Sequence, residues 1–108
     1  MSDPVRIFAA LADPTRQQLV DWMASGETGT ATEFAERLPM SRQAVARHLT
    51  ALAKAGLVTG LRRGKEVRYG FNPEPLVEAE SWLVDRGARW ERTLEGLARH
   101  LDTSEAGR

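Results

Sequence analysis

The sequence predicts a mainly α-helical fold with one small β-hairpin and about five helices, in a single domain over residues 1–102. Two short helical segments meet at a tight turn within residues 30–56, and an alternating hairpin pattern follows at 57–71. A long helix with a heptad-like apolar stripe occupies residues 74–101, before a frayed tail at 103–108. This order predicts a winged helix-turn-helix domain, expected to be dimeric because 108 residues bury only a modest core.

Two N-terminal helices are expected within residues 1–26. The first runs over residues 3–12, with apolar side chains at helical spacing. The second begins after Asp13, which can cap the helix N-terminus, and ends at Gly26. Arg16 in its first turn is expected to bond within the domain, with a contact to the DNA backbone as the alternative. The apolar side of this helix consists of Leu19, Val20, Trp22 and Met23, and a polar loop follows at 27–30.

The helix-turn-helix is expected over residues 30–56. Thr30 and Glu33 have the spacing of a capping box, in which each side chain accepts a hydrogen bond from the other residue's amide. Pro39 cannot continue that helix, and the Ser41 hydroxyl can cap a second one. The second helix places one apolar stripe on its inner face: Val45, Leu49 and Leu52.

The outer face of this second helix is predicted to enter the major groove of DNA. Arginine can bond guanine and glutamine can bond adenine through two hydrogen bonds each, so Arg42, Gln43 and Arg47 are the best candidates for base or phosphate contacts. Plain solvent exposure is the alternative for Gln43 and Arg47. Ser41 can bind a phosphate while it caps the helix, and His48, nearer the core, is expected to be structural or phosphate-bonding. The predicted DNA contacts are Ser41, Arg42, Gln43, Ala46, Arg47, His48 and Thr50.

A β-hairpin with a basic tip is expected over residues 57–71. Val67, Tyr69 and Phe71 alternate with polar residues, and the segment Arg63-Gly64-Lys65 has the composition of a turn. A two-stranded hairpin is marginal alone and must pack on the helices, with Tyr69 in the core. The outward cations are predicted to contact phosphates or a minor groove: Arg62, Arg63, Lys65 and Arg68.

The charges are strongly segregated along the chain, although the formal net charge is zero. Residues 41–68 hold seven basic side chains and one acid, and the remaining residues hold eight basic and fourteen acidic side chains. Phosphate binding depends on the local field, so this distribution favours a DNA-binding face. The alternatives are a solvated basic loop and a protein-interaction module whose basic face binds an acidic partner.

The long helix at residues 74–101 follows Asn72-Pro73, which can cap its N-terminus. Apolar residues seven apart predict a dimer interface, with packing on the helix's own domain as the alternative. The expected interface combines this stripe with the first helix: Val5, Phe8, Leu11, Trp82, Leu83, Trp90, Leu94, Leu97 and Leu101. A pocket for a small apolar effector between the helices is a further alternative.

Composition argues against several classes of function. The absence of cysteine excludes disulfides, thiolate metal sites and cysteine nucleophiles. No apolar run is long enough to span a membrane and the N-terminus lacks a secretory signal, so we expect a cytoplasmic protein. With two histidines, no glycine-rich phosphate loop and no clustered acid pair, the sequence predicts neither enzyme activity nor a cofactor.

Three segments of the sequence resemble the ArsR/SmtB-type transcriptional repressors. They are FAALADPTR at residues 8–16, the run from SRQAVARHL to AGLV at 41–58, and VRY at 67–69. The resemblance implies a homodimer formed by the first and last helices. It also implies that two recognition helices occupy successive major grooves of a palindromic operator in double-stranded DNA, with the wings beside the minor grooves.

The sequence departs from the metal-sensing members of that family. Their ligands are cysteines in the first helix of the helix-turn-helix, or aspartate and histidine pairs on the last helix. Residues 31–36, ATEFAE, contain no cysteine, and the last helix has no histidine before His100. The residues around Trp82 and Trp90 resemble a branch without metal sites. We therefore expect no metal, and an effector that is absent, organic or a protein.

Overall fold

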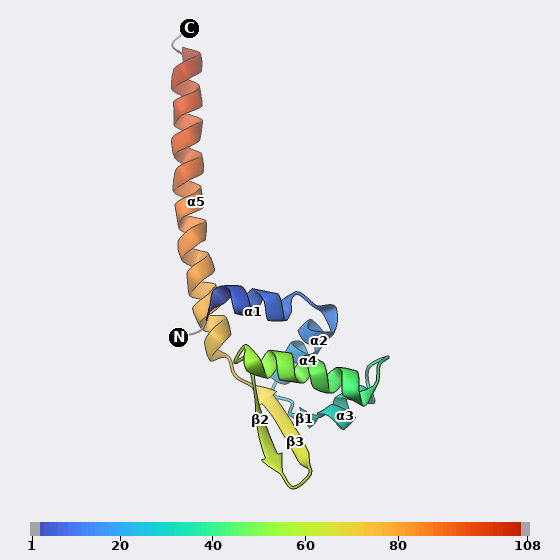
Figure 1. The fold of residues 1–108 in the computed structure, drawn as a ribbon. Coiled ribbons are helices and arrows are strands. Elements are labelled where there is room, and N and C mark those ends of the chain that lie inside the picture. Colours follow the sequence, from blue (N-terminus) through green and yellow to red (C-terminus); the bar gives the residue numbers. More distant parts are fainter. Residues whose placement is uncertain (1–2, 107–108) are drawn as a thin grey trace.

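The computed structural model describes residues 3–106, with side chains described for residues 3–101. The elements are α1 (Pro4–Leu11), α2 (Pro14–Ala24), β1 (Gly29–Thr30), α3 (Ala31–Ala35), α4 (Arg42–Lys54), β2 (Val58–Arg63), β3 (Glu66–Phe71) and α5 (Glu74–Ala106). Helices α1 to α4 and the sheet form one body, from which α5 projects as a long arm (Figure 1). The molecule measures 75 × 29 × 20 Å along its principal axes.

Carboxylate caps begin both N-terminal helices: the Asp13 cap was predicted, and the structure adds a cap at Asp3. Asp3 accepts a hydrogen bond from the amide of Val5 at 3.0 Å. Asp13 accepts from the amides of Thr15 and Arg16 at 2.8 and 3.1 Å. These bonds satisfy amides that have no partner inside the helix, and a proline in the first turn of each helix needs none. The local sequence therefore sets where both helices start.

The helix-turn-helix has the predicted caps at both of its helices. Thr30 and Glu33 form a reciprocal capping box on α3, with distances of 2.9 and 3.2 Å. The Ser41 hydroxyl accepts from the amide of Ala44 at 3.1 Å and so caps α4. At the other end of α4, Gly56 has a φ of 80°, a left-handed conformation that suits glycine. The amide of Leu57 then donates back to the carbonyl of Leu52, which completes the helix stop.

The core lies between α1, α2, α3, α4 and the start of β2. It includes the inner stripe of α4 that the sequence predicted, and those three side chains are completely inaccessible to solvent. The largest fully buried side chains are Phe34, Ile7, Leu19, Met23, Leu49, Leu52, Leu57 and Val45. Because α4 buries this stripe, its opposite face is left to solvent.

The predicted two-stranded wing is present as β2 and β3. The sheet has a third strand, in the order β1-β3-β2, which corrects the prediction of a polar loop at 27–30. Strand β1 pairs antiparallel with β3, with Gly29 opposite Tyr69 and Thr30 opposite Arg68. Two residues are too few to show an alternating pattern, so no sequence signal marks this strand. A Cβ at Gly29 would lie 2.8 Å from the ring of Phe34, so only glycine fits without a shift of that ring.

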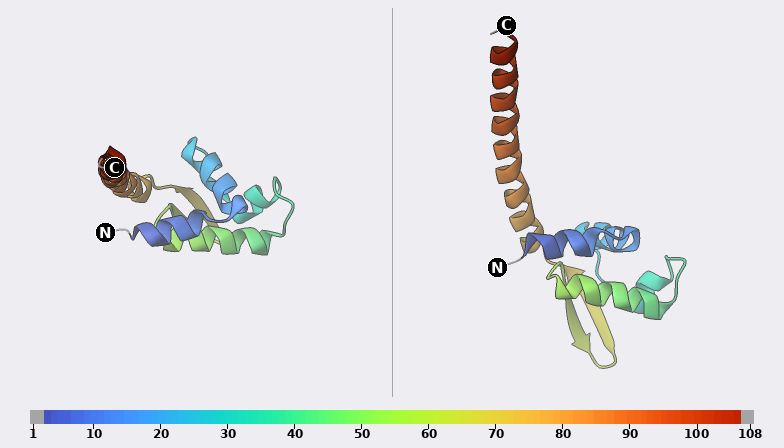
Figure 2. Two further views of the ribbon diagram at one scale, coloured as in Figure 1. Left: turned by 90° about the horizontal axis from the view of Figure 1, so that it is seen from above. Right: turned by 45° about the horizontal axis from the view of Figure 1, so that its top comes forward.

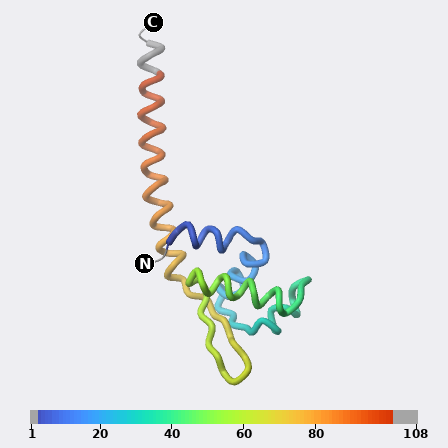
Figure 3. The backbone as a smooth tube through the Cα atoms, viewed as in Figure 1, coloured from blue at the N-terminus to red at the C-terminus, as the bar shows by residue number. Residues whose placement is uncertain are grey.

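Helix α5 leaves the body after its first turns, and Figure 3 follows this path along the backbone. The ring of Trp82 packs edge-on against Phe8 of α1, with centroids 5.8 Å apart. The helix continues to Ala106, which corrects the tail expected from residue 103; residues 103–106 contain neither glycine nor proline. Residues 107–108 lie outside the described part. None of the described helices has the length and apolar character needed to cross a membrane.

Candidate nucleic-acid interface

The outward face of α4 is exposed along its length. Gln43, Arg47 and Thr50 lie opposite the buried stripe, and Ser41 and Arg42 at the helix start are exposed as well. Ala46 is half-buried, and its carbonyl accepts the hydroxyl of Thr50 at 2.9 Å. Long polar side chains therefore project from one face of a rigid helix, which is the geometry that a major groove accepts.

Among the predicted DNA contacts at α4, the His48 side chain is the one that bonds to another helix of the domain. Its Nδ1 accepts a hydrogen bond from Nε of Arg16 at 3.2 Å, and the side chain is 21% exposed. Nη1 of Arg16 also reaches the carbonyl of Ala10 at 3.5 Å, which confirms the expectation that this arginine bonds within the domain. With Nδ1 accepting, Nε2 carries the hydrogen of the neutral ring and is the atom left to donate to a phosphate.

Asp13 lies beside this pair, with Oδ1 3.9 Å from Nδ1 of His48. The amide of Arg16 donates to the carboxylate and is the main cause that lowers the pKa of Asp13, to which the nearby His48 and the amide of Thr15 add. The cap of α2, the guanidinium of Arg16 and the imidazole on α4 thus form one network between two helices.

The wing tip carries three exposed cations around Gly64, whose φ of 62° forms the turn. Arg62 donates from Nε to the carbonyl of Gly64 at 3.4 Å. Lys65 lines a hollow of about 160 Å³ between the wing and α4, to which Arg42 also contributes. Arg63 lines a different hollow, of about 380 Å³, together with Leu61 and Arg68. The structure therefore brings Lys65 to the recognition helix and directs Arg63 away from it.

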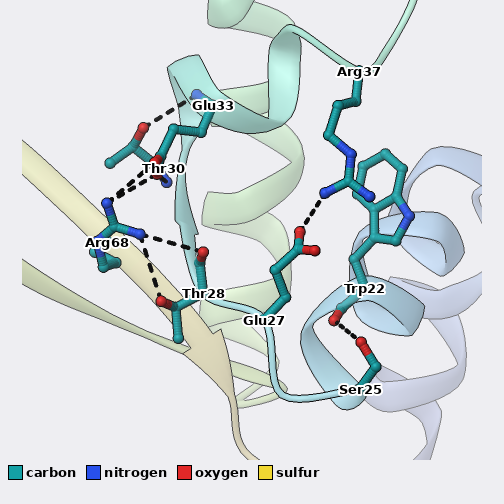
Figure 4. Close-up of polar contacts among 8 residues, drawn as sticks. All are labelled: Trp22, Ser25, Glu27, Thr28, Thr30, Glu33, Arg37 and Arg68. Atoms are coloured by element: carbon teal, nitrogen blue, oxygen red, sulfur yellow. Dashed lines mark hydrogen bonds and ion pairs between the residues drawn. The ribbon is translucent and has the colours of Figure 1, made fainter.

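Arg68, the fourth predicted wing contact, bonds to the body of the protein. Its guanidinium donates to the carbonyl of Thr28 at 3.3 Å and forms an ion pair with Glu33 at 3.0 Å (Figure 4). Glu33 also accepts the amide of Thr30, which is the main cause that lowers its pKa, followed by the hydrogen bond from Arg68. No local sequence pattern indicates this contact, because the paired side chains are 35 residues apart. The network joins the wing to the first helix of the helix-turn-helix.

A second cation outside the prediction, Arg37, fixes α3 against α2. Its guanidinium lies 3.8 Å from the ring centroid of Trp22 and pairs with Glu27 (Figure 4). The ring of Trp22 also stacks on Phe34, with centroids 6.0 Å apart. Trp22 is therefore a packing residue, as the sequence suggested.

The predicted dimer residues fall into two groups. Phe8 and Trp82 are partly buried where α1 meets α5, and Leu11, at the end of α1, is partly buried as well. The others are more than half exposed: Val5, Leu83, Trp90, Leu94, Leu97 and Leu101. The alternative that α5 packs only on its own domain does not hold for its distal half, because these leucines lie beyond the body (Figure 1).

Among the described residues, Asp13 and His48 are a carboxylate and an imidazole that lie close together. The chain has no cysteine, and the described part holds no cluster of three or more His, Asp or Glu side chains that could share an ion. In the pair formed by Asp13 and His48, the carboxylate is occupied by two amides and Nδ1 by Arg16. A metal would have to displace those bonds and would still lack a third ligand.

The fold, the capped recognition helix and the basic wing define a winged helix-turn-helix protein, and comparison with known proteins gives its family. Residues 11–60 match a family described as a helix-turn-helix domain. The HTH-type transcriptional regulator Rv2034 of Mycobacterium tuberculosis is 36% identical, over 93% of this chain and 90% of that protein.

Solved structures agree with this assignment. The ArsR-like transcriptional regulator from Rhodococcus sp. RHA1 has a TM-score of 0.76 and 37% identity, over 87% of this chain and 88% of that chain. The homodimeric winged helix-turn-helix DNA-binding domain of a possible ArsR-family regulator from Mycobacterium bovis has a TM-score of 0.61 and 25% identity, over 77% of each chain. The chain therefore belongs to the ArsR family of transcriptional regulators, whose members are DNA-binding proteins and not enzymes.

Proposed function

We propose that this protein is a homodimeric repressor that binds a palindromic operator in double-stranded DNA and acts in the cytoplasm. The observation that carries the proposal is the exposed cationic face shared by α4 and the wing. Arg42 and Lys65 line one hollow between these elements, and Arg47 projects from the adjoining outward face of α4. Such a face fits the two kinds of contact that operator binding needs, to base edges and to phosphates.

Each predicted contact has a distinct part in this proposal. Arg42, Gln43 and Arg47 contact base edges in the major groove, where arginine and glutamine make bidentate hydrogen bonds. Ser41 and Nε2 of His48 donate to phosphates beside them. The exposed wing cations, Arg62, Arg63 and Lys65, extend the contact to the adjacent backbone, whereas Arg68 positions the wing through Glu33.

In a dimer, the recognition helix of the second protomer contacts the second half-site of the palindrome. The exposed apolar side chains of α5 and Val5 of α1 are the surface for dimerisation, and the Mycobacterium bovis relative is homodimeric. Two recognition helices related by a two-fold axis contact half-sites about 34–36 Å apart, one turn of DNA.

We propose that the signal for release from DNA is not a metal ion. The chain has no thiolate, and its Asp13 and His48 pair is engaged by bonds within the domain. An organic molecule or a protein is then the effector, if the repressor has one.

Selection from random duplexes tests this function. The wild type is expected to enrich one palindrome, and a variant carrying both Arg42→Ala and Arg47→Ala is expected to bind it about a thousandfold more weakly. A dimer loses four base contacts in that variant, and each is worth at least about 1 kcal/mol. The variant should remain a dimer in sedimentation.

The matched control is Arg92→Ala, which removes an exposed arginine of α5 away from the recognition helix. It should bind the palindrome as the wild type does. Enrichment of no palindrome would refute operator binding and favour the alternative in which the basic face binds an acidic protein. Unchanged operator protection by the double variant would refute the assigned contacts.

A further inference from the structure

A second cationic surface lies on the side of α4 that faces away from the wing. Helix α1 runs alongside α4 on that side, while the hairpin lies on the other side (Figures 1 and 2). Between α1 and α4 is an open groove of about 260 Å³. Four alanines of the two helices and of the turn after α4 line it, together with Arg6 of α1, Arg16 of α2 and Lys54 of α4.

The groove is positively charged. Its lining contains three cations and no acidic side chain. Arg16 is held in place by His48 and the carbonyl of Ala10. Arg6 and Lys54 are exposed, and within the described residues neither forms a hydrogen bond or an ion pair through its side chain. In this groove the guanidinium of Arg16 is fixed by hydrogen bonds, whereas the charged groups of Arg6 and Lys54 are available to bind an anion.

The groove opens beside the recognition face of α4. Lys54 follows Thr50 by four residues and Arg47 by seven, so the three side chains lie on the same face of the helix. Arg42, by contrast, is on the flank that faces the wing. A ligand that covers the outward face of α4 must pass the groove on one side and the wing on the other.

Duplex DNA has this shape. The major groove is about 12 Å wide and an α-helix with its side chains is about 10–12 Å across, so a phosphate strand passes on each side of a helix placed there. In the proposed function the wing cations contact the backbone of one strand, on the flank of α4 where Arg42 lies. That function includes no contact from α1 to the other strand.

We infer that the groove between α1 and α4 binds the second sugar-phosphate strand, an inference that rests on the proposed function. Arg6 and Lys54 contact phosphates directly, and Arg16 narrows the groove from its anchored position. The alanine lining has little bulk, which lets the strand approach the helix backbones. These contacts carry no information about base sequence and add affinity for any duplex.

Salt dependence separates such contacts from base contacts. The slope of log affinity against log salt falls by about 0.9 for each phosphate that the protein no longer neutralises, and a dimer carries each substitution twice. Arg6→Gln and Lys54→Gln should therefore each reduce the slope by about 1.8. Extrapolated from 1 M salt, that reduction weakens binding about thirtyfold at 0.15 M.

The experiment measures both variants on the selected palindrome and on a random-sequence duplex, with Arg92→Gln as the control for loss of one positive charge. The inference predicts equal losses on both duplexes and an unchanged enriched palindrome. Arg92 is exposed on the face of α5 opposite the apolar stripe, so its variant should match the wild type. Circular dichroism melting establishes that each variant is folded.

The outcomes distinguish the groove from the function itself. If Arg6→Gln and Lys54→Gln keep the wild-type slope of log affinity against log salt, the groove does not bind phosphates. The proposed function would still stand if the variant with both Arg42→Ala and Arg47→Ala loses operator binding. A weaker dimer in sedimentation of Arg6→Gln would also overturn the inference about the groove, because Arg6 would then be an interface residue. Absence of salt-dependent duplex binding by the wild type would refute the proposed function.

Discussion

The distal half of α5 should need a second protomer in order to remain helical. Beyond the contact of Trp82 with Phe8 this helix leaves the body, and Leu94 and Leu97 are 56% and 53% exposed. Most helical stability in proteins comes from packing of an apolar face, and within a single chain this half of the helix leaves its apolar face exposed. Loss of the dimer should therefore be accompanied by loss of helix.

The perturbation is the double substitution Leu94→Ala and Leu97→Ala. Burying a whole leucine side chain is worth about 1.5–3 kcal/mol, so covering the exposed half contributes about 1 kcal/mol. Four such side chains in the dimer give about 4 kcal/mol, which weakens association about a thousandfold. Alanine is the best helix former, so any loss of helix reports the absence of the partner and not the helix propensity.

Sedimentation equilibrium measures the dissociation constant, and circular dichroism at 222 nm measures helix content at the same concentrations. Leu61→Ala is the matched control, because this leucine of the wing is 65% exposed and lies outside the proposed interface. A double variant that stays as dimeric as the wild type would refute the interface. A monomer with undiminished helix content would refute the claim that the arm depends on its partner.

Two further predictions concern stability. Gly29→Ala should lower the free energy of unfolding by about 1–3 kcal/mol, because its Cβ meets the buried ring of Phe34 at 2.8 Å; an unchanged melting temperature would show that the ring gives way at no cost. Asp13 and Glu33 have lowered pKa values in the folded protein, so their stabilising contribution is complete at neutral pH and disappears as the pH falls through those lowered values. Urea titrations at pH 7 and pH 3 should show a larger decrease in stability for the wild type than for an Asp13→Asn, Glu33→Gln variant, and equal decreases would contradict the assignment.

The parts of this fold that depend on neighbouring residues could be predicted from the sequence. The capping box of Thr30 and Glu33, the Ser41 cap and the glycine stop at Gly56 each involve residues a few positions apart, and all are present. The buried stripe of α4 follows from helical periodicity in the same way. Local chemistry therefore placed the recognition helix and its exposed face.

The parts of the structure that the sequence did not predict depend on contacts between distant residues. Strand β1 exists because β3 supplies partners for Gly29 and Thr30, and no pattern in two residues shows that. Arg68 was predicted to contact DNA because its charge matches the basic wing, and the sequence did not show that it bonds to Glu33, 35 residues earlier. The sequence shows that a residue is a cation close to the predicted DNA-binding face. It does not show which acidic side chain the fold places next to that cation.

Because α5 is long, a small change in its orientation in the dimer would produce a large change in the relative positions of the two DNA-binding bodies. The 33 residues of α5 extend about 50 Å. If two such arms cross in the dimer, a change of about 4° in their crossing angle displaces the far ends by about 3.5 Å, close to the rise of one base pair. An event that alters packing along the arms, far from any nucleotide, would then shift the two recognition helices out of register with their half-sites.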